Sequence, residues 1–152
     1  MKSLQRILAT SAPASVLLIR LLVGVVFLSE GIQKFLFPSD LGVGRFIKIG
    51  IPAAQIMTPF VGVIEIACGT LVILGLLTRL AAIPLIVDML VAISTTKIPI
   101  LIKSGFWAMA HEARVDYAML LGAVFLLIVG AGQWSIDGKL SKQTEASGHA
   151  DG

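Results

Sequence analysis

Apolar residues fill this chain in four long blocks, which cover about residues 14–37, 56–77, 79–96 and 115–134. A helix needs about 20 mostly apolar residues to cross the hydrocarbon of a bilayer. The blocks lack the alternation of period two that marks the strands of a membrane β-barrel. Because backbone polar groups in lipid must bond to one another, helices are favoured over any open sheet. The pattern predicts an all-α membrane protein, an antiparallel bundle of four transmembrane helices with short interfacial segments, within residues 1–137.

The segments between the blocks also have a recognisable character. Residues 39–55 contain three glycines together with charged residues, so any helix there should be brief. Residues 97–114 mix basic side chains with Trp107 and aliphatic residues, a composition suited to a segment lying in the membrane interface. Residues 138–152 are polar and rich in Gly and Ser, and this predicts a disordered tail.

Composition supports the assignment to a membrane. The chain is 57% hydrophobic and 14% charged, whereas soluble domains average about 45–50% and about 25%. The net charge is only +3, and Lys and Arg lie mostly near the ends of the apolar blocks. This arrangement fits lipid headgroups and gives no indication of a nucleic-acid partner. Four spans would put both termini on one side, and the basic residues divide five to six between the two sides, so their number does not decide the orientation. The basic N-terminus (Lys2 and Arg6) and the basic turn at Arg79 favour both termini in the cytoplasm.

Cysteine and histidine are scarce. The single cysteine, Cys68, excludes intramolecular dithiol chemistry, and no spacing of Cys and His resembles a metal site. The two histidines are His111 and His149, and the second lies in the polar tail. A haem held between two transmembrane histidines is therefore excluded, which leaves a single axial ligand from His111 as the only haem arrangement open. No haem, flavin or metal site is evident in this chain.

Ionisable residues inside the apolar blocks are the main indication of function. Glu30 and Lys34 lie one helical turn apart in the first block, and Glu65 and Asp88 lie near the middle of the second and third. A charge at the centre of a membrane helix costs about 2.5–3.5 kcal/mol on insertion scales. We expect Glu30 and Lys34 to pair, because acid and base at i and i+4 attract in this orientation. Such groups either pair within the bundle or form a site.

The spacing of polar and small residues predicts which faces meet. Thr58, Gly62, Glu65 and Gly69 follow spacings of 4, 3 and 4, so they share one face of a helix. Small residues on that face let a neighbouring helix approach closely, which turns Glu65 away from lipid. By the rise of a helix, Glu65 and Asp88 each lie about 14 Å inside their blocks. The charges of separate helices should then form one polar seam through the bundle.

The order of these residues resembles a known family. The motifs are Arg20-Leu21-Leu22-Val23-Gly24, Gly31-x-x-Lys34, Glu65-x-x-x-Gly69 and Gly75-Leu76-Leu77-Thr78-Arg79. Together they resemble the DoxX family over roughly residues 17–135. The resemblance implies a multi-pass protein of four helices in the bacterial inner membrane. The family is named for a subunit of a quinone-linked thiosulfate or terminal-oxidase system, and relatives are linked to redox complexes with soluble partners.

Two sets of site residues follow. The proposed catalytic set, which would relay protons and contact a ligand, is Glu65, Lys34 and Asp88. The proposed ligand-binding set is Arg20, Glu30, Gly62, Gly69 and Asp116. The family motifs contain Arg20, Lys34, Glu65 and Gly69, whereas Glu30, Asp88 and Asp116 are proposed on physical grounds alone.

The sequence is compatible with three functions. The first is the membrane subunit of a quinone-linked redox complex, in which the quinone binds between helices and a soluble or membrane partner supplies the electron carrier. If the chain is an enzyme, it is then a non-haem subunit of a quinone-dependent oxidoreductase. The second is a binding or transport module for a small amphipathic molecule or ion, and the third is a purely structural assembly subunit. The small-residue face would also suit a homo-oligomer.

Overall fold

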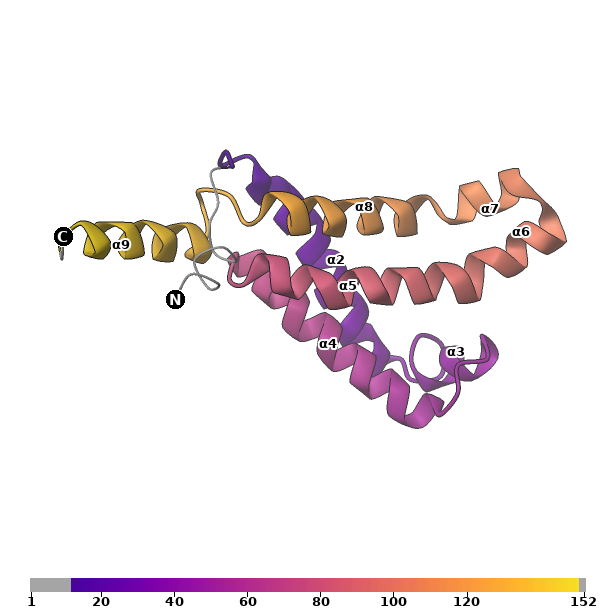
Figure 1. Cartoon of the computed structure of the whole chain (residues 1–152). Coiled ribbons are helices and arrows are strands. Elements are labelled where there is room, and N and C mark those ends of the chain that lie inside the picture. The colour runs from indigo at the N-terminus through magenta and orange to yellow at the C-terminus, as the bar shows by residue number, and fades with distance from the viewer. Residues whose placement is uncertain (1–11, 151–152) are drawn as a thin grey trace.

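A computed structural model describes the backbone of residues 12–150 and the side chains of residues 12–143. That part of the chain contains helices and no strand (Figure 1). Lys2 and Arg6, which support the expected orientation, lie outside the described residues. The helices are α2 (Val16–Leu36), α3 (Val43–Lys48), α4 (Ala54–Leu74), α5 (Thr78–Ala92), the π-helix η1 (Ile93–Lys97), α6 (Ile98–Ser104), α7 (Phe106–Glu112), α8 (Arg114–Val129) and α9 (Ile136–Ala150).

Within residues 12–150, three helical runs are long and apolar enough to cross a membrane. They are Val16–Leu36, Ala54–Leu74 and the continuous run Thr78–Ser104, of 21, 21 and 27 residues. The fourth predicted block contains α8, which has 16 residues and ends at Gly130, where φ is 84°. That length corresponds to about 24 Å, less than the hydrocarbon thickness of about 30 Å. The chain is therefore an all-helical membrane protein with three clear candidate spans.

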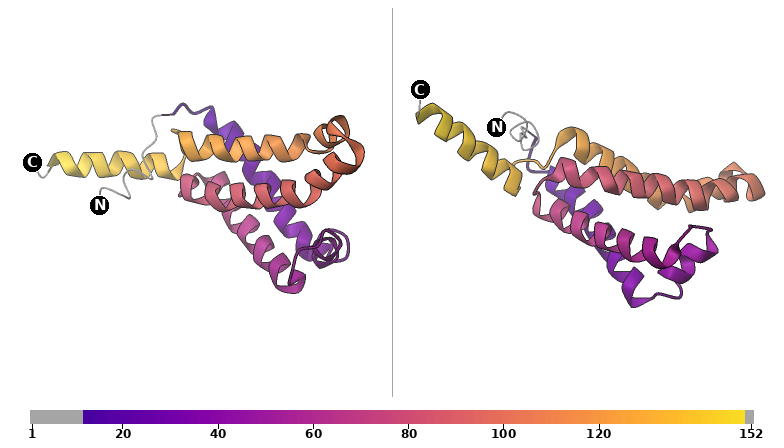
Figure 2. Two further views of the ribbon diagram at one scale, coloured as in Figure 1. Left: turned by 45° about the vertical axis from the view of Figure 1, so that its right-hand side comes forward. Right: turned by 60° about the horizontal axis from the view of Figure 1, so that its bottom comes forward.

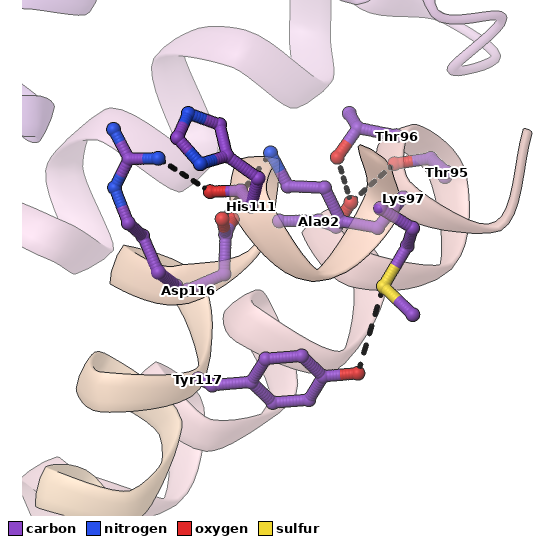
Figure 3. Close-up of polar contacts among 9 residues, drawn as sticks. Ala92, Thr95, Thr96, Lys97, His111, Asp116 and Tyr117 are labelled. Carbon is purple, nitrogen blue, oxygen red and sulfur yellow. Dashed lines mark hydrogen bonds and ion pairs between the residues drawn. The ribbon is translucent and has the colours of Figure 1, made fainter. Parts of the chain in front are cut away.

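The third run continues beyond its predicted end near residue 96 because a π-turn carries it past a proline. Pro99 has no N–H to donate to the Thr95 carbonyl, and its ring would crowd that carbonyl in a regular helix. The wider turn of η1 lies just before it. The hydroxyl of Thr96 donates to the Ala92 carbonyl at 2.6 Å, and Thr95 also reaches this carbonyl at 3.3 Å (Figure 3). These bonds satisfy backbone groups that the π-turn displaces.

The long helices form two pairs. α2 packs along α4, and α5 packs along α8. The pairs meet near the junction of α4 and α5 and diverge toward α3 on one side and α6–α7 on the other (Figures 1 and 2). Buried side chains from all four helices fill the end where the pairs meet, which we call the meeting end. The largest fully buried apolar ones are Val23, Phe27, Val72, Leu85 and Leu126. The bundle predicted from the sequence is thus two helix pairs that share a core at one end.

Glycines allow α2 and α4 to approach closely. The predicted face of α4 is confirmed, because Thr58, Gly62, Glu65 and Gly69 are all buried. A Cβ added at Gly69 would lie 2.8 Å from the Leu28 nitrogen and 2.9 Å from the Gly24 carbonyl oxygen. A Cβ added at Gly62 would instead meet the Phe35 ring, at 2.7 Å from Cε2. The backbones themselves are therefore in contact at Gly69.

This difference predicts unequal effects of two matched substitutions. Gly69→Ala should lower the free energy of unfolding by about 1–3 kcal/mol, because the added methyl group forces two helix backbones apart. Gly62→Ala should cost less, since the half-exposed Phe35 side chain can move away. Titration with SDS in mixed micelles, followed by circular dichroism, measures both. An equal loss, or a larger loss for Gly62→Ala, would contradict the packing described.

Two buried charged side chains at the meeting end form hydrogen bonds with backbone groups. Arg20 is 2% exposed, and its guanidinium donates to the carbonyls of Val72 at 2.9 Å and Trp134 at 2.6 Å. It also donates to the carbonyls of two further residues, Ile73 and Ala131. Arginine here satisfies carbonyls at the C-terminal end of α4 and in the loop after α8, where helices lack internal donors.

Asp137 completes this end of the molecule. Its carboxylate accepts bonds from the backbone N–H groups of Leu77 at 2.8 Å and Thr78 at 3.0 Å, and so caps the start of α5. Asp137 belongs to α9, a helix that the structure places over most of the tail predicted to be disordered. The first turn of α9 is held by the Ser135 hydroxyl, which accepts from the Gly138 N–H at 2.9 Å.

Candidate functional site

An ion pair joins α2 to α4 inside the membrane-spanning part of the chain. The Lys34 ammonium donates to Glu65 Oε1 at 2.8 Å and lies 2.6 Å from Oε2. Oε2 receives no hydrogen bond of good geometry, so the ammonium contacts this oxygen as a charge. The side chains are 11% and 3% exposed. Glu65 is therefore shielded from lipid by the α2–α4 contact, as its position among small residues predicts.

Lys34 does not form the pair that the sequence suggests. Glu30 lies one turn before it on α2 but is exposed, and Lys34 reaches across to α4 instead. The close approach of Gly31 to the Gly62 carbonyl explains this choice, because it brings Glu65 within reach of the ammonium. A pair between helices has replaced the expected pair within one helix.

Asp88 of α5 brings a second carboxyl to the pair. It is half-buried, and its charge interacts with Lys34 and Glu65. The arrangement therefore sets one ammonium beside two carboxyl groups. We call Lys34, Glu65 and Asp88 the polar cluster; Glu30 lies near enough to act on Asp88 electrostatically.

Asp116 belongs to a different group. It pairs with Lys97 at 3.2 Å, at the start of α8 and the end of η1 (Figure 3). Nearby, the Arg114 guanidinium donates to the His111 carbonyl at 2.7 Å. Lys97 lies nine residues beyond Asp88 along one helix, about 14 Å away. Asp116 is thus outside the polar cluster. His111 contributes its backbone carbonyl to the bond with Arg114.

The remaining predicted ligand-binding residues have structural surroundings. Arg20 lies at the meeting end, where its donors bind backbone carbonyls. Gly62 and Gly69 lie against α2. The expected continuous seam is therefore three separate groups: Arg20 with Asp137, the polar cluster, and Lys97 with Asp116. Among residues 12–143, no group of three His, Cys, Asp or Glu side chains is placed to hold a metal ion.

Two residues were missed by sequence reasoning as parts of these groups. Asp137 lies in a polar segment 60 residues from its bonding partner Leu77, and no local pattern indicates that contact. Thr58 was placed on the correct face but not in the site. Its hydroxyl is buried and has no hydrogen-bond partner among the described residues. It lies two turns from Glu65 on the same face, and the 4, 3, 4 spacing was the signal that could have included it.

Comparison with known proteins places these residues in a family. The sequence model of the DoxX family matches residues 15–98. The chain belongs to the DoxX family. The match contains the whole polar cluster, together with Arg20, and it ends before Asp116 and Asp137.

This DoxX protein is similar in sequence to two bacterial proteins. "Uncharacterized membrane protein Rv3486" of Mycobacterium tuberculosis (strain ATCC 25618 / H37Rv) is 57% identical over 149 residues, which are 94% of this chain and 91% of that protein. "Putative oxidoreductase CatD" of Bacillus subtilis (strain 168) is 30% identical over 121 residues, which are 80% of this chain and 83% of that protein. No solved structure is significantly similar to the chain. Both relatives are bacterial proteins, and the first is named as a membrane protein, in agreement with the three apolar helices of this chain.

Proposed function

We propose that this DoxX protein is the membrane subunit of a quinone-linked redox complex, and that the polar cluster is its quinone site. The observation that carries the proposal is the shielded meeting of Lys34, Glu65 and Asp88 from three helices. Ionisable groups at membrane depth are costly and commonly mark sites of binding or proton transfer. The similarity to a protein named as an oxidoreductase supports a redox role.

The chemistry of a quinone matches these three side chains. Reduction of a quinone to a quinol takes up two electrons and two protons. The Lys34 ammonium would donate a hydrogen bond to a quinone oxygen, and Glu65 and Asp88 would relay both protons to the quinone from the aqueous side. The electrons would come from a redox centre of a partner protein. In this proposal the chain binds the quinone and moves protons, while the partner carries out the electron transfer.

A quinone-binding measurement tests the proposal. The purified protein in nanodiscs would be titrated with decylubiquinone, with tryptophan quenching as the readout. Glu65→Gln should weaken binding by about tenfold or more, because it loses a bond to a charged group worth about 1.5–3 kcal/mol. Asp116→Asn is the matched control, since this carboxyl lies outside the polar cluster and should leave binding unchanged. Absence of binding to the wild type, or equal loss in both variants, would overturn the proposal.

A second function is supported by the ion pair itself. Lys34 and Glu65 satisfy each other and join α2 to α4, which would suit a structural assembly subunit. If Glu65→Gln and Lys34→Met fold and leave every phenotype intact, this function is favoured. Uptake of a solute by the protein alone in liposomes would instead favour the transport module. A location in the bacterial inner membrane, with both termini in the cytoplasm, also stays a prediction.

A further inference from the structure

Two short segments lie at the end of the molecule away from α9, one on each helix pair. They are α3, on the side of α2 and α4, and α6–α7, at the tip of the α5–α8 pair (Figures 1 and 2). Neither belongs to the polar cluster. We refer to them together as the far-end segments.

Helix lengths place both segments at one level. α2 has 21 residues, so α3 follows a helix about 32 Å long. α5 and η1 end at Lys97, which is 19 residues beyond Thr78, or about 29 Å. Both values are close to the hydrocarbon thickness of about 30 Å. The far-end segments therefore begin where the headgroup layer begins.

The far-end segments expose large apolar side chains. Trp107 is 83% exposed, Ile102 78% and Ile47 62%. Phe106 is also exposed and packs edge-on against the Trp107 ring, with centroids 5.2 Å apart. An apolar patch of this kind marks a contact with a membrane or with another protein, and exposed tryptophan is typical of the membrane interface.

The charges of the far-end segments favour contact with a membrane over contact with another protein. Residues 38–50 and 98–114 carry four basic side chains and two acidic ones. All four basic side chains are exposed. Arg114 donates to the His111 carbonyl, and Arg45, Lys48 and Lys103 lie beside the apolar residues. Basic and apolar residues interleaved on short helices suit the headgroup layer of an anionic bilayer.

We propose that α3 and α6–α7 lie in the headgroup layer and together bind anionic phospholipid through Arg45, Lys48 and Lys103. The aliphatic and aromatic side chains enter the upper acyl region, while the three cations contact headgroup phosphates. Two such segments on diverging helix pairs give the lipid two separate points of attachment. This proposal is independent of the quinone site.

Fluorescence of a single tryptophan tests the depth. The chain has two tryptophans, and the carbonyl of Trp134 accepts from Arg20, at the opposite end. In a Trp134→Phe protein in nanodiscs, Trp107 emission should be quenched by phospholipids brominated near the headgroup and protected from acrylamide. Quenching by acrylamide without quenching by bromolipid would overturn the proposal, and would identify the tip as a surface for a water-soluble partner.

A lipid titration tests the charge. Native mass spectrometry would measure the affinity for phosphatidylglycerol and for phosphatidylcholine. The variant Arg45→Gln/Lys48→Gln/Lys103→Gln should lose phosphatidylglycerol affinity by about fivefold for each charge removed. The control Lys139→Gln/Lys142→Gln removes two cations from α9 and should keep that affinity. Equal losses in the two variants, or no loss in the first, would overturn the proposal.

Discussion

Replacement of Lys34 by methionine is expected to lower the free energy of unfolding by about 3–5 kcal/mol, the usual cost of leaving a buried charge without its partner. The Lys34 ammonium contacts both oxygens of Glu65, whose side chain is 3% exposed. Methionine has a similar length and is tolerated at membrane depth, so the loss reports the missing charge. SDS titration in mixed micelles, followed by circular dichroism, measures the change.

Two controls make this result specific. Lys139→Met removes an exposed lysine on α9 and should change stability by less than about 0.5 kcal/mol. The double variant Lys34→Met/Glu65→Gln should lose less than the sum of the single variants, because no unpaired charge then remains between α2 and α4. If Lys34→Met resembles Lys139→Met, the pair does not stabilise the bundle.

The second large effect is expected at the meeting end. Arg20→Met should destabilise the protein by about 3–5 kcal/mol, because a buried carbonyl that loses its donor costs about 1–3 kcal/mol. Arg20 donates to four backbone carbonyls, in two segments that its guanidinium joins. The same SDS titration measures this variant.

Arg45→Met is the matched control for Arg20. It removes an exposed arginine on α3 and should leave stability nearly unchanged in detergent. Hydrogen exchange adds a local readout: in Arg20→Met, the amides after Val72 and Ala131 should exchange faster than in the wild type. A loss of stability no larger than that of Arg45→Met would show that Arg20 does not hold this end together.

Apolar blocks predicted the first two long helices closely. The blocks at 14–37 and 56–77 correspond to α2 and α4, which end near Phe37 and Gly75. The third helix extends beyond the end of the third predicted block, which was placed before the charged residue Lys97. In the structure its charge pairs with Asp116, and the helix runs on to Ser104. The sequence pattern alone does not show that a charge within a helix is paired with a residue of another helix.

The site could be predicted by face but not by partner. Glu65 was expected to point at a neighbouring helix, because small residues recur on its face of α4, and the structure confirms this. Its partner could not be read from the sequence. The i, i+4 spacing within α2 predicts Glu30 as the ion-pair partner of Lys34. The close approach of Gly31 to Gly62 instead brings Glu65 within reach of the ammonium. Contacts between distant segments, such as Asp137 with Leu77, leave no local periodicity to find.

The proposed site depends on the contact between Lys34 and Glu65, which lies shielded between α2 and α4. Solid-state NMR in lipid bilayers tests it directly, through rotational-echo dephasing between 15Nζ of lysine and 13Cδ of glutamate. The structure predicts a short-range contact in the wild type, from an ammonium 2.6 Å from Oε2, that disappears in both Lys34→Met and Glu65→Gln. Dephasing that persists in Glu65→Gln, or that is absent from the wild type, would show that Lys34 and Glu65 do not form this pair.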